Sequence, residues 1–94
     1  MTPPTFEWDA EKAAENLRKH GVAFEEALTV FQDPLAKIHD DPDHSAEEPR
    51  AIITGHSTQS RLRQVSFTER RSRIRSISAR LATRAERQDY EENT

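Results

Sequence analysis

The chain has 94 residues, of which 33% are apolar and 33% charged, with a formal net charge of −3 and no cysteine. A chain of this length is expected to form one domain, residues 1–94. Ordinary globular domains are about 45–50% apolar and about 25% charged, so we expect the core of this domain to be small. Disulfides and thiolate metal sites are excluded, and no stretch approaches the roughly 18 apolar residues of a membrane span. The first residues lack the basic and apolar segments of a signal peptide, so we expect a cytoplasmic protein.

A short edge strand and a capped helix are expected first. Phe6–Trp8 has the apolar content of an edge strand, and Asp9 stands where a side chain caps the amides of a helix over 10–19. Gly21 is expected to end this helix in the left-handed conformation. The apolar stripe of the helix is predicted to consist of Ala13, Ala14 and Leu17.

A second helix is predicted over 24–31, because its apolar residues recur at helical spacing. Asp33-Pro34 should end it. The apolar face consists of Phe24, Ala27, Leu28 and Phe31.

The rest of the chain predicts strands and a last helix. Gly55 is expected to break the second strand, and residues 40–49 form an acidic loop in which Asp41, Pro42, Asp43 and Ser45 make a turn. Thr83 and Glu86 form a capping box for a helix over 84–91, before a frayed tail. The four strands are predicted at 35–39, 50–54, 62–68 and 73–79. The fold class is therefore α+β, with an antiparallel sheet of about four strands packed against two N-terminal helices and one C-terminal helix.

Charge is distributed unevenly along the chain. Residues 61–87 contain nine arginines and no lysine, against only Glu69 and Glu86. Guanidinium groups bind phosphate oxygens in a planar fork and stack on bases, so this segment predicts a surface for nucleic acid or for an acidic partner protein. The alternative is an arginine-rich surface that contacts only solvent.

A series of short motifs occurs in a recognisable order. They are Phe6-Glu7-Trp8-Asp9, Lys12, Asn16, Lys19-His20-Gly21-Val22, Phe24-Glu25-Glu26-Ala27, Phe31-x-Asp33-Pro34, Asp41-Pro42-Asp43-His44-Ser45, Gly55-x-Ser57, Thr68-Glu69-Arg70, Arg73-Ile74-Arg75, Ile77-Ser78-Ala79-Arg80, Ala82-Thr83-x-x-Glu86-Arg87 and Tyr90-Glu91. Their order and spacing resemble the BrnT family of toxins over about residues 6–91, nearly the whole chain.

The resemblance implies a RelE-like fold and an RNA endonuclease that inhibits translation as the toxin of a type II toxin–antitoxin pair. It also implies a BrnA-like antitoxin with a ribbon-helix-helix DNA-binding domain, which would carry the complex to operator DNA. A toxin dimer within a heterotetramer is a further expectation.

Several residues depart from the family pattern, including Ala23 where a capping serine is expected and the polar residues Arg63, Gln64 and Ser66 in the third strand. Phe67 stands where a polar aromatic residue or histidine is common, and Ser76 where an apolar residue is expected. Arg71 and Ser72 stand where a Gly-Asp turn is usual. These departures favour an alternative hypothesis, a catalytically weakened module that binds its antitoxin or RNA without cleaving.

Metal-independent RNA cleavage needs a base for the 2′-OH, cations for the transition state and an acid for the leaving 5′-oxygen. Glu69 is the candidate base, although it could instead pair with Arg75 or Arg80 to order the site. His20, at a helix C-terminus that favours its charged form, is the candidate acid, with a plain capping role as the alternative. The predicted catalytic residues are Lys19, His20, Glu69, Arg75 and Arg80.

Further arginines extend the predicted phosphate-binding surface. The predicted RNA-binding residues are Arg61, Arg70, Arg73, Arg84 and Arg87. Trp8 and Tyr90 could stack on bases, although core packing is the stronger expectation for Trp8. No cofactor is predicted. The spacing of the acidic and histidine residues between His39 and His56 fits no standard metal site, so no metal is predicted either.

Overall fold

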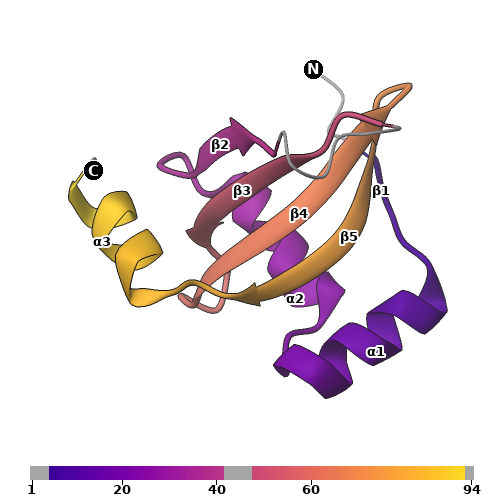
Figure 1. The fold of residues 1–94 in the computed structure, drawn as a ribbon, viewed down its shortest axis with the longest axis horizontal. Coiled ribbons are helices and arrows are strands. Elements are labelled where there is room, and N and C mark those ends of the chain that lie inside the picture. Colours follow the sequence, from indigo (N-terminus) through magenta and orange to yellow (C-terminus); the bar gives the residue numbers. More distant parts are fainter. Residues whose placement is uncertain (1–4, 42–47, 93–94) are drawn as a thin grey trace.

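The computed structural model describes residues 5–41 and 48–92, and Figure 1 shows the course of the chain. Most of the turn predicted at residues 41–45 and part of the predicted tail lie outside the described residues. The described elements are β1 (Thr5–Glu7), α1 (Ala10–His20), α2 (Phe24–Ala27), the 3₁₀ helix η1 (Leu28–Gln32), β2 (Lys37–Asp40), β3 (Ala51–His56), β4 (Leu62–Arg70), β5 (Arg73–Leu81) and α3 (Arg84–Glu92).

The sheet has five strands in the order β1-β5-β4-β3-β2. All neighbouring strands are antiparallel except β1, which runs parallel to β5 with Phe6 opposite Ile74. The α+β class is confirmed, but the predicted antiparallel sheet of about four strands is wrong. A parallel pair needs a long connection, and here that connection comprises every element between β1 and β5, so no local pattern indicates it.

Helix α1 begins and ends as its sequence predicts. The Asp9 carboxylate accepts a hydrogen bond of 2.8 Å from the amide of Glu11. Gly21 adopts φ 70°, and its amide donates to Leu17. The predicted apolar stripe holds at Ala13, which packs against the core, and is wrong at Ala14 and Leu17, which are exposed. Leu17 is 52% exposed, and Asn16 is the buried residue of the helix.

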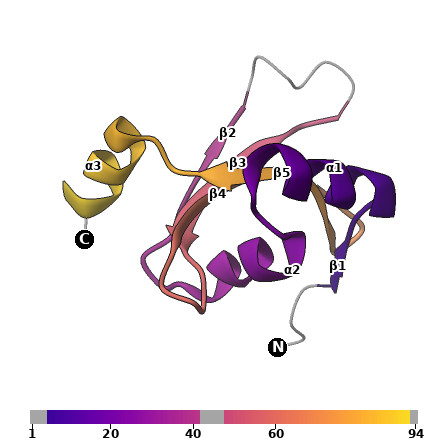
Figure 2. The same cartoon turned by 90° about the horizontal axis from the view of Figure 1, so that it is seen from below.

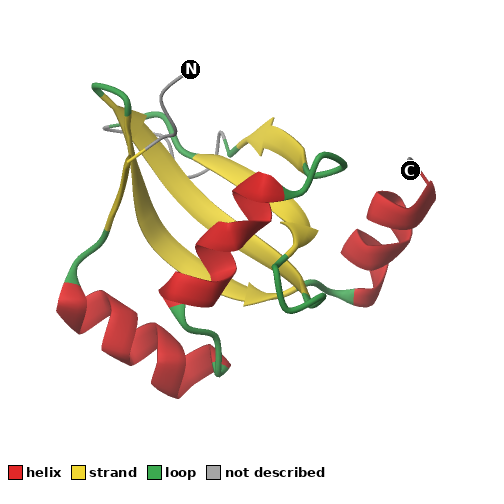
Figure 3. Cartoon of the chain, turned by 180° about the vertical axis from the view of Figure 1, so that it is seen from behind, coloured by secondary structure: helices red, strands yellow, loops and turns green. Residues whose placement is uncertain are grey.

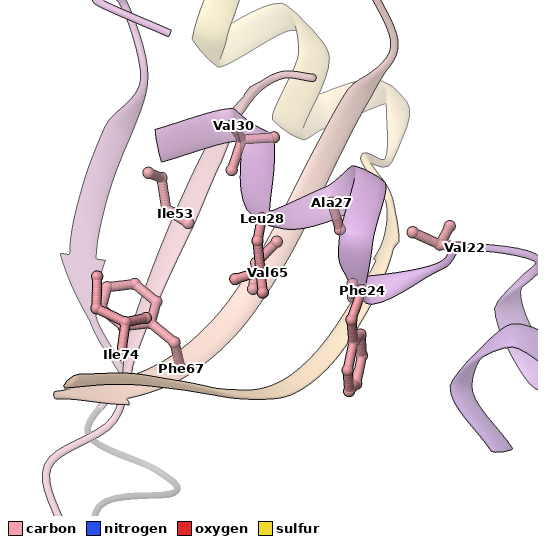
Figure 4. Packing of buried hydrophobic residues seen from close by; sticks show 10 residues of the cluster. Val22, Phe24, Ala27, Leu28, Val30, Ile53, Val65, Phe67 and Ile74 are labelled. Carbon is pink, nitrogen blue, oxygen red and sulfur yellow. The ribbon is translucent and has the colours of Figure 1, made fainter. Parts of the chain in front are cut away.

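The second predicted helix is two short helices in succession, since the α-helix ends at Ala27 and η1 continues to Gln32. A 3₁₀ turn is common where an α-helix ends, and Asp33-Pro34 follows directly. Figure 3 shows these helices crossing one face of the sheet. Phe24 and Val30 are fully buried there against Ile53 and Val65 (Figure 4).

Strand β3 continues through Gly55 to His56, so the predicted strand break at Gly55 is wrong. The glycine instead allows a close approach of the segment that follows η1. A Cβ at this position would lie 2.9 Å from the Cβ of Ala36 and 3.2 Å from the Asp33 carboxylate.

Ser76 is 1% exposed, and its hydroxyl has no hydrogen-bond partner among the described residues. Because a buried unsatisfied hydroxyl is costly, we expect Ser76→Ala to raise the free energy of unfolding by about 1 kcal/mol in urea denaturation. Ser57 is a matched control, since its buried hydroxyl donates to Glu26 over 2.6 Å. Ser57→Ala should therefore have the opposite sign, and equal effects of the two variants would contradict this account.

Candidate active site

A short β1 leaves most of the outer edge of β5 without a strand partner. β1 pairs only with Arg73, Ile74 and Arg75, and α1 takes its place farther along. The buried Asn16 amide group donates to the carbonyl of Ala79 over 2.8 Å and accepts from the Ala79 amide over 3.0 Å. It also donates to the carbonyl of Val22 over 2.9 Å. One side chain thus completes the strand edge and fixes α1 beside it.

A groove of about 230 Å³ lies between α1 and β5, and we call it the α1–β5 groove. Lys12, Asn16 and Lys19 follow one another at i, i+4 and i+7, so they share one face of the helix. The groove is lined by Lys12, Glu15, Asn16, Lys19, His20, Ile77 and Ser78. Two ammonium groups, a carboxylate and an imidazole therefore surround one cavity, in which a phosphodiester could contact cations and proton carriers together.

A bulge in β5 forms the far wall of the groove. Ser66 pairs with Ser78 whereas Phe67 pairs with Ser76, so the register omits Ile77. The extra residue changes which later side chains face each side of the sheet. Arg80 consequently pairs with Gln64, on the same face as Arg75, whereas strict alternation from Arg75 would turn it to the opposite face.

This face of the sheet, which we call the open face, is the one toward the viewer in Figure 1, and no described helix crosses it. Its arginines form two groups, roughly 20 Å apart at about 3.3 Å per strand residue. On β5 the open face consists of Arg73, Arg75, Ser78 and Arg80.

The first group of arginines surrounds the β4–β5 turn. A pocket of about 620 Å³ there is lined by Glu7, Arg70, Arg71 and Arg73. Glu7 lies 3.6 Å from Arg73 and 4.0 Å from Arg75, so one carboxylate partly neutralises two guanidinium groups. Arg70 donates from Nε to Glu48 over 2.8 Å. Arg75 therefore lies beside Glu7. Within the described residues, it forms no hydrogen bond or ion pair with a residue of the α1–β5 groove.

The second group is centred on Arg80. Its Nη1 and Nη2 donate to the two oxygens of Glu86 over 2.9 and 2.8 Å, and Nη2 also donates to Gln64. Gln64 and the amide of Thr83 donate to the same carboxylate over 2.8 and 2.7 Å. The hydrogen bonds from Arg80 lower the pKa of Glu86 to about 2. This Arg80–Glu86 junction joins β5 to the start of α3. The amide of Glu86 in turn donates to the Thr83 hydroxyl over 3.2 Å, which confirms the predicted capping box.

The junction predicts acid sensitivity. Its carboxylate has a pKa of about 2 in the folded chain against an ordinary value of 4.5. The stabilisation it gives is therefore full above pH 4.5 and is lost as the pH falls toward 2. We expect the wild type to lose roughly 2–3 kcal/mol of unfolding free energy across this window. The Glu86→Gln variant, which lacks the carboxylate, should lose less over the same pH range. Urea denaturation at several pH values measures it, and an unchanged acid dependence in Glu86→Gln would refute the assignment.

A second polar cluster holds the end of α3. The hydroxyl of the buried Tyr90 donates to Asp33 over 2.6 Å, and the amide of His56 donates to the same carboxylate over 2.8 Å. Burial and the Asp33 carboxylate raise the pKa of Tyr90 to about 12. Tyr90 is consequently an anchor of α3, which lies beside one end of the sheet in Figure 2, rather than a surface for stacking bases.

The remaining predicted residues lie apart from the groove. Glu69 is exposed and pairs in register with Ile74, whose side chain belongs to the core, so it faces away from Arg75. It forms no ion pair within the described residues. Arg61 approaches Glu26 at 3.9 Å on the helix side of the sheet. Arg84 and Arg87 are exposed on α3. His56 serves the Tyr90 cluster, and residues 5–41 and 48–92 contain no grouping of acidic and histidine side chains suited to a metal ion.

Comparison with known proteins identifies the family. Residues 8–86 match the family described as "Ribonuclease toxin, BrnT, of type II toxin-antitoxin system". The chain belongs to the BrnT family. The crystal structure of the Brucella abortus ribonuclease toxin BrnT is 25% identical in sequence and superposes with a TM-score of 0.63, covering 87% of this chain and all of that one. Among curated proteins, none matches the sequence.

Sequence patterns miss several residues of this BrnT-family groove. Lys12, Glu15 and Ser78 are not among the predicted site residues, although Lys12, Asn16 and Lys19 have the helical spacing that could have indicated a shared face. The position of Ser78 depends on the bulge at Ile77, for which the only sequence signal is the broken alternation between Ile74 and Ile77.

In the part of the chain described here, no helix is long and apolar enough to cross a membrane.

Proposed function

We propose that this chain is the endoribonuclease toxin of a type II toxin–antitoxin pair and that it cleaves RNA in the α1–β5 groove without a metal. The observation that carries the proposal is the convergence of Lys19 and His20 with Lys12 and Glu15 in one cavity, in a family of ribonuclease toxins. We further propose that residues 6–91 act as one RelE-like domain, that cleavage inhibits translation, and that the protein acts in the cytoplasm.

The reaction we propose is an internal transfer. The 2′-oxygen attacks the neighbouring phosphorus as a base removes its proton, the bond from phosphorus to the 5′-oxygen breaks, and an acid protonates that oxygen. The products are a 2′,3′-cyclic phosphate and a 5′-hydroxyl. Lys12 and Lys19 would bind the phosphate and stabilise the added charge of the transition state.

His20 is assigned as the acid, since its imidazole lies in the groove beside the two lysines and imidazole is the usual proton carrier near neutral pH. The base is better assigned to Glu15 than to Glu69, because Glu15 lines the groove. We propose that Arg75 and Arg80 bind phosphates beyond the cleaved bond, and that the RNA strand continues over the open face toward Arg70 and Arg73.

The partner we propose is a BrnA-like antitoxin with a ribbon-helix-helix domain, in a heterotetramer that contains two toxin chains. Binding to operator DNA would occur only through the antitoxin. The toxin family of the chain and the thin core, at 33% apolar residues, support a partner that buries additional surface.

The test is cleavage of single-stranded RNA by the purified chain in the presence of a chelator. We expect fragments ending in a 2′,3′-cyclic phosphate, identified by mass spectrometry, and growth arrest when the chain is expressed without antitoxin. Fragments ending in a 3′-hydroxyl, or activity that requires an added metal, would overturn the mechanism.

A second candidate function is a module that binds its antitoxin or RNA without cleaving it. The specific observation in its favour is that Arg80 is already bound by Glu86 and that Arg75 lies beside Glu7. Folded protein that binds RNA but neither cleaves it nor arrests growth would establish this alternative.

A further inference from the structure

A second pocket lies on the other side of the molecule from the open face, between β1 and the helices that cover the core. It has a volume of about 360 Å³, within the range of small-molecule sites, and we call it the aromatic pocket. Its lining residues are Phe6, Trp8, Glu25, Leu28, Thr29 and Gln32.

Ring contacts fix the two aromatic walls. The Phe6 ring packs on Phe31 with centroids 5.3 Å apart, and Trp8 meets Phe24 edge to face at 6.1 Å. Both side chains are only partly buried, so each keeps surface for a ligand. Rigid aromatic surfaces of this kind are what single-stranded RNA-binding proteins use to hold unstacked bases.

The aromatic pocket offers no cation to a phosphate group. Glu25 is the sole charged residue of the lining, and no lysine or arginine accompanies it among the described residues. The Thr29 hydroxyl is already used, since it donates to the Glu26 carbonyl over 2.6 Å and accepts from the Thr58 amide over 2.8 Å. The part of a ligand that enters the pocket must therefore present uncharged rings and hydrogen-bond donors, while any phosphate stays in solvent.

Glu25 and Gln32 are available to such a ligand. Within residues 5–41 and 48–92 neither side chain has a hydrogen bond or an ion pair, whereas Glu7, Glu26 and Glu86 are each paired with arginine. An ionised carboxylate only accepts hydrogen bonds, and Gln32 both donates and accepts. Guanine offers the matching edge, because its N1–H and N2–H₂ donate side by side while O6 accepts. Adenine, cytosine and uracil each lack this pair of adjacent donors.

We propose that the aromatic pocket binds a guanine base of the RNA substrate, stacked on Trp8 or Phe6 and read by Glu25. The proposal rests on the proposed ribonuclease function. The path to the cleavage site is short, because Trp8 precedes α1 by two residues and Lys12, which lines the α1–β5 groove, lies in the first turn of that helix. The pocket would thus place cleavage near a guanosine.

Trp8 is the only tryptophan, so its fluorescence reports on the pocket directly. The probes are 5′-GMP, AMP, CMP and UMP added to the full chain at neutral pH. We expect saturable quenching with GMP bound about tenfold more tightly than the others, the effect of one charge-assisted pair of hydrogen bonds. Glu25→Gln should abolish the preference. Glu11→Gln, the same change at an exposed position outside the pocket, should retain it.

The outcomes separate this proposal from the proposed function. His20→Ala should still bind GMP even where it no longer cleaves RNA. No saturable quenching by GMP, equal affinity for the four nucleotides, or an unchanged preference in Glu25→Gln would overturn the guanine site whatever the cleavage assay gives. A Trp8 response to purified antitoxin with none to nucleotides would also overturn it, and would assign the pocket to a protein anchor.

Discussion

His20→Ala is expected to slow RNA cleavage by roughly 10²–10⁴-fold, the usual contribution of a general acid, while the chain stays folded. The imidazole is exposed at the end of α1 and no hydrogen bond within the described residues depends on it, so its removal should not disturb the helix. Initial rates on a fluorogenic single-stranded RNA in chelator measure the loss, and circular dichroism reports the fold. His39→Ala is the matched control, because His39 is exposed on β2 away from the groove.

The leaving group distinguishes an acid from any other role of His20. In a substrate with sulfur in place of the bridging 5′-oxygen, the leaving group is a thiolate, which departs without a proton. This substrate should be cleaved at nearly the same rate by the wild type and by His20→Ala. A deficit that persists with this substrate would mean that His20 acts as the base or only shapes the groove. A deficit that disappears would establish its role as the acid.

Local chemistry explains which parts of the fold can be predicted from the sequence. Asp9, Gly21 and the Thr83–Glu86 box act within one helical turn, and the structure has all three where they are expected. Strand pairing across the chain has no such signal. The parallel pairing of β1 and the change of register near Ile77 depend on contacts between segments that lie far apart in sequence.

The residues of the candidate site also fall into two groups, those that local spacing predicts and those whose positions depend on contacts that spacing does not show. Lys19 and His20 lie together because neighbouring residues at a helix end reach the same groove. The sequence places Glu69 among arginines, but successive residues of a strand point to opposite faces of the sheet. Glu69 pairs with Ile74 and therefore faces away from Arg75. Spacing also gives no sign that Glu7, from the first strand, approaches Arg75, or that the turn into α3 brings Glu86 back onto Arg80.

In the hairpin between β4 and β5, the turn residues disfavour the backbone conformation that the turn requires, and the sequence alone reveals this conflict. Arg71 and Ser72 have φ of 51° and 68°, the left-handed values of a two-residue turn that glycine and asparagine adopt readily. The sequence is unfavourable there, yet the turn forms, because the long pairing of β4 with β5 fixes the geometry of both strand ends. Tertiary pairing has overridden local preference, at a cost stored in the turn.

Asn16→Leu is expected to lower the free energy of unfolding by about 3 kcal/mol or more, since the change leaves three buried backbone groups without partners at about 1–3 kcal/mol each. Those groups are the amide and carbonyl of Ala79 and the carbonyl of Val22. Asn16→Asp keeps the acceptor for the Ala79 amide but loses both donors, so it should also destabilise the chain. Urea denaturation measures both.

Leu17→Ala is the control for Asn16→Leu, and the pair tests the fold against the sequence pattern. Periodicity places Leu17 in the core and Asn16 on the surface, whereas the structure exposes 52% of Leu17 and buries Asn16. We expect Leu17→Ala to change stability by no more than about 0.5 kcal/mol, as for an exposed site. A large loss in Leu17→Ala with little in Asn16→Leu would mean that α1 packs by its apolar stripe. The groove that holds Lys19 and His20 would then have a different wall, because Asn16 is what fixes α1 to β5.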